Sequence, residues 1–165
     1  MKNDFVVFDI TANGLDEDAE IVSFAALRFE NEVPTERFIE YVNIGVILSD
    51  NISEILGITN DTVQNYVITI EDAYWQLIEF CGTSEVVTTH QVFDNKFIER
   101  ICREYDLPVL ENHITDLDTL FHLKYNCGYT SRFAEKQLGI TTDETDNWRH
   151  LDIAGKTYIE LSGEM

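Results

Sequence analysis

Basic residues are scarce in this 165-residue sequence: eleven Lys and Arg stand against thirty-one Asp and Glu, giving a formal net charge of −20. Such a charge repels phosphate backbones and raises the electrostatic cost of binding nucleic acid. The imbalance is uneven, since residues 1–95 hold 3 bases and 18 acids while residues 96–165 hold 8 and 13. Any contact with nucleic acid is therefore expected from the second half, and the acidic excess otherwise serves solubility or a protein partner.

Cysteines and long apolar runs are also few. The three cysteines, Cys81, Cys102 and Cys127, have no paired spacing, and their odd number gives no disulfide framework. This usage favours a reducing, cytoplasmic location. No segment approaches the ~18 apolar residues of a membrane span, and no apolar stretch follows a basic N-terminus, so we expect neither secretion nor membrane insertion.

Apolar residues are nevertheless plentiful at 44% of the chain, with ten Phe and seven Tyr, which is enough to build a core. The length suits one domain, so residues 1–165 are expected to form a single unit. We find no internal repeat, low-complexity tract or linker in the sequence that would divide it.

The apolar pattern predicts mostly sheet up to residue 43 and mostly helix after it. Alternating apolar positions predict strands, the first three forming an antiparallel meander, over residues 4–10, 20–30, 35–43, 85–89 and a short stretch within 111–123. Helical spacing predicts helices over 49–58, 59–66, 70–81, 93–106, 131–139 and around 151–161. The expected cap residues are Ser49, Thr59, Asp116, Asp118 and Gly139.

Five segments stand out in order along the chain: FVVFDITANGLD, VNIGVILSDNISEILGITNDTV, THQVFDNKFIER, YTSRFAEKQLGI and WRHLDIAGKT. In order and spacing they resemble the motifs of the DEDDh (DnaQ-like) 3'-5' exonucleases, the superfamily of proofreading exonucleases and ribonuclease T. The likeness covers nearly the whole chain. It implies an α/β, RNase H-like fold with a central mixed five-stranded sheet and helices on both faces.

The chemistry of that superfamily requires four carboxylates and one histidine. Two Mg²⁺ or Mn²⁺ ions, roughly 3.5 to 4 Å apart, supply the attacking hydroxide and neutralise the leaving oxygen. Hard oxygen ligands hold the ions, and a general base takes the proton of the water. The resemblance assigns two of the metal-ligand positions to Asp9 and Asp94.

The other three positions have changed. The resemblance puts the family's Glu at Thr11, its general-base His at Trp148 and its last Asp at Ile153. Thr carries no charge, Ile offers no ligand, and the indole of Trp only donates a hydrogen bond where a proton acceptor is required. We therefore expect a degenerate site, with no metal or only weakly bound Mg²⁺ or Mn²⁺ at the remnant ligands Asp9 and Asp94.

A shifted alignment offers a way to restore the site. A slip of one residue in the last helix would put Asp152 at the last ligand position and let His150 reach the cleft. One residue rotates a helix by about 100°, however, and Leu151 and Ala154 already match the family's packing positions without a slip. Without the resemblance, Asp9 and Asp94 would be ordinary turn and helix-dipole acids, and His90 an ordinary polar contact.

Three functions are compatible with these features. The favoured one is a catalytically inactive or strongly impaired pseudo-exonuclease that binds a protein partner or mimics nucleic acid through its acidic surface. The second is an active Mg²⁺- or Mn²⁺-dependent 3'-5' exonuclease on single-stranded DNA or RNA with altered metal ligands. The third is a non-catalytic nucleic-acid-binding module, which the acidity of the chain disfavours.

Overall fold

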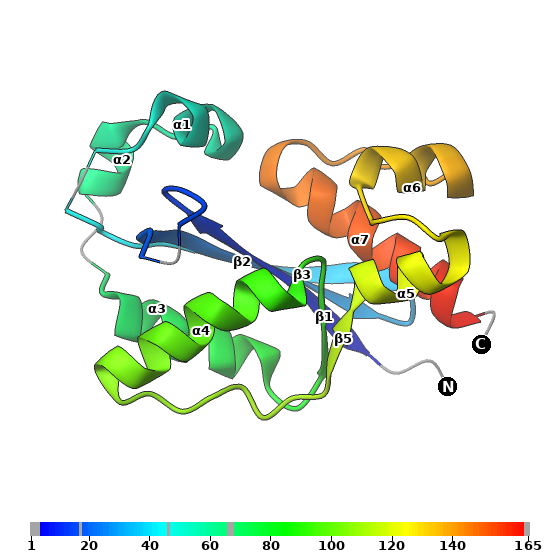
Figure 1. Ribbon diagram of the computed structural model, residues 1–165, viewed down its shortest axis with the longest axis horizontal. Helices are drawn as coiled ribbons and strands as arrows, with labels where there is room; N and C mark the ends of the chain where they lie inside the picture. The colour runs from blue at the N-terminus through cyan, green and yellow to red at the C-terminus, as the bar shows by residue number, and fades with distance from the viewer. Residues whose placement is uncertain (1–3, 17, 46, 66–67, 164–165) are drawn as a thin grey trace.

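The computed structural model describes residues 4–16, 18–45, 47–65 and 68–163. Its centre is a mixed sheet of five strands in the order β3-β2-β1-β4-β5 (Figure 1). The strands are β1 Phe5–Ala12, β2 Ile21–Glu30, β3 Val33–Tyr41, β4 Glu85–Thr88 and β5 Ile114–Asp116. The first three pair antiparallel, whereas β4 and β5 run parallel to β1. The predicted mixed sheet is therefore confirmed.

Helices cover both faces of the sheet (Figure 1). Their bounds are α1 Asp50–Leu56, α2 Asn60–Gln64, α3 Ile70–Cys81, α4 Gln91–Tyr105, α5 Leu117–Tyr125, α6 Ser131–Leu138 and α7 Asp146–Gly163. The central strand β1 sends Val6, Phe8 and Ile10 into the layer of α3 and α4, and Phe5 and Val7 into the layer of α5, α6 and α7. Its neighbouring residues thus point to opposite cores, as expected for a strand covered on both faces.

Two predicted helix caps have the expected hydrogen bonds. The Ser49 side chain accepts from the backbone N–H of Ile52, and the Thr59 side chain accepts from that of Thr62. Both residues are extended, so each satisfies an N–H group that has no partner within its helix. Part of the helix predicted over 59–66 lies outside the described residues, because Tyr66 is not among them.

The short strand predicted within 111–123 is confirmed as β5, and the residues after it are helical, as the predicted cap Asp116 indicates. Only Ile114–Asp116 pairs with β4, and α5 follows at once, with the Asp116 carboxylate accepting from the backbone N–H of Asp118. Asp118 is not a cap, because its carboxylate accepts instead from the backbone N–H of Tyr129 at 2.6 Å. The last helix also begins five residues earlier than expected, at Asp146. Within the described ranges, no helix is both long enough and apolar enough to cross a bilayer.

The backbone of α7 approaches the sheet closely at Gly155. This glycine is buried against the ring of Phe29 on β2, and a Cβ atom at Gly155 would overlap that ring. The ring itself has little freedom, because it is fully buried and stacks on Phe5 with ring centroids 4.9 Å apart. The distance between α7 and the sheet therefore depends on the absence of a side chain at residue 155.

The variant Gly155→Ala is expected to lower the free energy of unfolding by about 1–3 kcal/mol through overpacking, partly offset by a gain in helix propensity of up to about 1 kcal/mol. Urea denaturation measures the change. Glu160→Ala, an exposed position on the same helix, is the matched control and should lie within about 0.5 kcal/mol of wild type. A Gly155→Ala protein as stable as this control would show that the approach is not tightly packed.

Candidate active site

The candidate site lies where the parallel strands end. Val7 of β1 pairs with Val87 of β4, so Asp9 lies just beyond the end of β4. The last residue of β4, Thr88, pairs with Asp116, the last residue of β5. Because carboxyl ends of parallel strands meet at one edge of a sheet, the fold brings these side chains together from distant parts of the sequence.

Asp94 joins this edge from the first turn of α4, which begins shortly after β4. Asp94 is 1% exposed, and the hydroxyl side chain of Thr88 lies beside its carboxyl group. Burial raises the pKa of Asp94 well above its ordinary value, and the nearby charges of Asp9 and Asp116 raise it further, whereas the hydrogen bond with Thr88 lowers it. Asp9 and Asp94, the two positions that the resemblance assigns to metal ligands, are therefore electrostatic neighbours in the fold.

His150 on α7 contacts Asp9 directly. Its Nε2 lies 3.2 Å from Oδ2 of Asp9, across a sequence separation of 141 residues. Leu151 and Ala154 are fully buried, so α7 has the packing face expected without a slip. From the sequence, we expected His150 to reach the cleft if the last helix were shifted by one residue. The structure shows His150 in contact with Asp9 without such a shift.

Asp152 does not replace the missing ligand. Its Oδ2 accepts from Thr142 Oγ1 at 2.5 Å and from Lys156 Nζ at 2.7 Å. A step of two residues turns the helix by about 200°, so Asp152 lies on the side of α7 away from His150. A one-residue shift of the last helix, which would put Asp152 at the last ligand position, is therefore wrong.

The three altered positions differ in their surroundings. Thr11 is two residues beyond Asp9 on β1, hence on the same strand face, and pairs with Ser23 of β2. Ile153 is fully buried in the core shared by β1, α5 and α7. Trp148 packs at the margin of that core, with the guanidinium of Arg37 5.1 Å from its ring centroid. Trp148 and Ile153 thus extend the apolar core.

A pocket of about 770 Å³ opens beside Asp9. Its walls combine polar groups with apolar side chains, namely Asp9, Ile10, Leu15, His90, Gln91, Val92, Phe93, Lys96, Phe97, Asp116 and Asp118. Leu15 and Val92 are 89% and 73% exposed, so the pocket has apolar rims facing solvent. His90 is exposed and precedes α4 without a side-chain cap bond. None of Thr11, Trp148 and Ile153 lines this pocket.

The residues present do not fit a two-ion centre. Among the described residues, no three His, Cys, Asp or Glu side chains are placed to hold a metal ion. Asp9 and Asp94 supply two carboxylates, whereas Thr11 adds no charge and Ile153 adds no donor atom. Whether one ion binds weakly to Asp9 and Asp94 stays a prediction.

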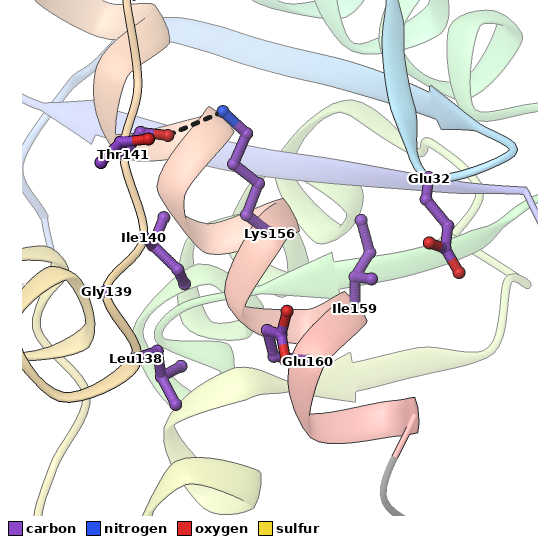
Figure 2. Close-up of a pocket in the computed structure, with 8 residues that line it drawn as sticks. All are labelled: Glu32, Leu138, Gly139, Ile140, Thr141, Lys156, Ile159 and Glu160. Atoms are coloured by element: carbon purple, nitrogen blue, oxygen red, sulfur yellow. Dashed lines mark hydrogen bonds between the residues drawn. The ribbon is translucent and has the colours of Figure 1, made fainter.

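A smaller groove of about 330 Å³ lies on the other side of α7 (Figure 2). It is lined by Glu32, Leu138, Gly139, Ile140, Thr141, Lys156, Ile159 and Glu160. Figure 2 shows Lys156 reaching the carbonyl oxygen of Thr141, a hydrogen bond of 2.9 Å. Lys156 also donates to the carboxylate of Asp152. The charge of Asp152 is therefore balanced in this groove, which Asp9 does not line.

Comparisons with known proteins agree on one family. A sequence model described as Exonuclease matches residues 6–151. The DNA polymerase III subunit epsilon of Aquifex aeolicus (strain VF5) is 35% identical over 102 residues, which cover 61% of this chain and 50% of that protein. The PolC-type DNA polymerase III of Caldanaerobacter subterraneus subsp. tengcongensis is 31% identical over 121 residues, covering 73% of this chain and 8% of the polymerase. The chain thus spans at most half the length of these relatives.

Solved structures show the same fold. The nuclease domain of 3'hExo, described as a DEDDh family member bound to rAMP, superposes with a TM-score of 0.74 at 19% identity, covering 99% of this chain and 91% of that one. Exonuclease X, solved with 5' overhanging duplex DNA, gives a TM-score of 0.74 at 16% identity, covering 97% and 92%. These likenesses confirm the predicted α/β, RNase H-like fold.

The pKa of Asp94 has a consequence for stability. A carboxyl group whose pKa is raised by folding costs stability at every pH above its unfolded pKa of about 3.9, and the cost grows until the pH passes its folded pKa. The variant Asp94→Asn removes this cost, so its free energy of unfolding should exceed that of wild type at pH 8 by about 1 kcal/mol or more.

Urea denaturation at pH 8 and at pH 4 measures the effect, which should shrink at the lower pH. Glu99→Gln, an exposed acid on the same helix, is the control and should show little change at either pH. An Asp94→Asn protein that is less stable than wild type at pH 8 would mean that Asp94 is stabilised as a carboxylate.

Proposed function

Because the chain belongs to the DEDDh (DnaQ-like) 3'-5' exonuclease superfamily and has its RNase H-like fold, we propose that it is a pseudo-exonuclease. It keeps the exonuclease fold, has lost all or nearly all nuclease activity, and acts by binding a protein partner. The observation that carries the proposal is the lack, among the described residues, of any three side chains that could hold a metal ion.

The contacts of the altered residues support the loss of activity. Ile153 is fully buried among apolar side chains, so the last ligand position can neither bind metal nor approach substrate. Trp148 stands at the general-base position and packs beside Arg37. A missing general base alone removes about 10²- to 10⁴-fold of rate, and the loss of ligands adds to that effect.

The proposed loss is tested with purified protein, single-stranded DNA and RNA, and Mn²⁺. We expect wild type to release nucleotides no faster than the Asp9→Ala variant, which lacks a retained ligand position. Digestion by wild type that disappears in Asp9→Ala would contradict the proposal and favour the alternative, an active exonuclease with altered ligands. Asp9, which lines a pocket of about 770 Å³ and whose charge acts on Asp94, is what keeps this alternative open.

The acidic surface supports a basic protein partner. The net charge of −20 gives a strong negative field, which speeds association with positively charged surfaces and opposes binding to nucleic acid. Asp16, Asp18 and Glu20 are exposed in the loop between β1 and β2, next to Leu15 on the pocket rim. This loop places negative charge at the mouth of the former nuclease site.

Neutralising that loop tests the partner. The triple variant Asp16→Asn, Asp18→Asn and Glu20→Gln leaves the backbone hydrogen bonds from Asn13 to Glu20 and from Ala19 to Asp16 in place. Affinity capture at about 50 mM and 300 mM salt should retain a basic protein on wild type at low salt only, and less of it on the variant. Equal capture by both proteins would exclude this loop as the binding site of the partner. Tight binding of an oligonucleotide at low salt would instead favour the nucleic-acid-binding module.

A further inference from the structure

The pocket beside Asp9 has an apolar side, which α4 forms in large part. Val92, Phe93 and Phe97 of this helix line the pocket, and the ring centroids of Phe93 and Phe97 lie 4.7 Å apart. Leu15, from the loop after β1, adds the most exposed large apolar side chain among the described residues. Apolar side chains that stay exposed around a cavity are typical of a binding surface, and a volume of about 770 Å³ has room for a large side chain of a partner.

The charged side chains around this pocket are mainly acidic. Asp9, Asp116 and Asp118 line it from β1, the end of β5 and the first turn of α5. Within the described ranges, Lys96 is the one Lys or Arg that lines it. Asp116 and Asp118 accept hydrogen bonds from backbone N–H groups and a hydroxyl, neutral donors that leave both negative charges in place. The exposed acids of the loop between β1 and β2 extend this charge along the rim beside Leu15, so the field favours a cationic ligand.

We propose that this pocket binds a basic peptide segment of the protein partner, in which one large apolar side chain lies between Lys or Arg residues. The inference rests on the proposed function, and it names the surface and the chemistry that recognise the partner. The apolar side chain of the segment packs against α4 and Leu15, where it covers exposed apolar surface. The flanking Lys and Arg side chains face the acids at the strand ends and in the loop.

Lys96 sets the orientation of the bound segment. It follows Val92 by four residues, so the two side chains share one face of α4. The positive charge of Lys96 repels a Lys or Arg from the apolar side of the pocket and leaves that side to the apolar residue of the segment. A single-stranded nucleic acid would be attracted by Lys96 and repelled by the acids, which is the opposite dependence on charge.

The test uses a short, fluorescein-labelled synthetic peptide with a central Phe between Lys and Arg residues, and it measures fluorescence anisotropy. Wild type should bind this peptide more tightly at about 50 mM than at 300 mM salt. A peptide with Ala in place of the Phe should bind about tenfold more weakly, because it buries less apolar surface. A peptide with Gln in place of every Lys and Arg should show no binding, because it lacks the charge that the acids attract.

The double variant Leu15→Ser, Val92→Ser removes apolar contacts from the rim and should weaken binding of the Phe peptide by about tenfold. The matched control is Val109→Ser, Leu123→Ser, because these exposed apolar residues do not line the pocket. The control should bind as wild type does. Equal affinity in wild type and the rim variant would overturn the inference, as would the absence of peptide binding to wild type. All four positions are exposed, and circular dichroism shows whether each variant is folded.

The variant Lys96→Gln predicts the sign of the charge effect. It should bind the Phe peptide about twofold to fivefold more tightly, because a repulsive charge has been removed from the pocket. Lys136→Gln makes the same change in net charge at an exposed position of α6 that does not line the pocket, and it should stay close to wild type. Weaker peptide binding by Lys96→Gln would contradict the inference. Binding of a labelled single-stranded oligonucleotide that Lys96→Gln weakens would make nucleic acid the occupant and overturn it as well.

The same preparations separate this inference from the proposed function. Digestion of an oligonucleotide by wild type, absent in Asp9→Ala, contradicts the loss of activity whatever the peptide titrations give. A Phe peptide that wild type does not bind, or binds equally well after the rim residues are changed, contradicts this docking site even if no preparation digests an oligonucleotide.

Discussion

The close approach of α7 to the sheet is the constraint on which the site depends. The buried Gly155 lets the helix backbone lie against the ring of Phe29, and that ring stacks on Phe5 of the central strand. With the helix held at this distance, the residues on its inner face have fixed neighbours. The identity of His150, and not a shift of the helix, therefore decides which side chain of α7 contacts Asp9.

The fold fixes where acidic side chains gather in this protein, and their neighbours fix the electrostatics of the site. The topology still gathers acidic side chains at the ends of the parallel strands, because strand order and register place them there. Here the cluster consists of the carboxyl groups of Asp9, Asp94 and Asp116, with His150 in contact with Asp9. A shared fold thus says where a site lies, and the residues in it say what the site can do.

Much of the fold could be predicted from the sequence because its strands alternate clearly and its caps are chemically specific, as at Ser49 and Thr59. The exact end of the fifth strand was harder to place, because a short apolar run is compatible with both strand and helix. The strand ends where its pairing with β4 ends, after only three residues. The apolar residues that follow form α5. No local pattern contains that information.

The candidate site was predictable in part. Order and spacing of the motifs located Asp9 and Asp94, and the comparisons confirm the family that supplied them. The contact between His150 and Asp9 joins residues 141 apart and depends on how α7 crosses β1, which no local spacing reveals. The one available signal was the position of His150, three residues before Ile153 on a helix whose packing face was already known.

The burial of Ile153 also limits how this edge of the protein could be redesigned. Ile153 is fully buried in the apolar core that β1 shares with α5 and α7, so a carboxylate placed there would need a counter-charge that this core does not supply. Adding an acid at residue 153 would therefore weaken folding before it could change the chemistry of the site. An engineered ligand is better placed on the exposed rim of the pocket beside Asp9, where the core is not disturbed.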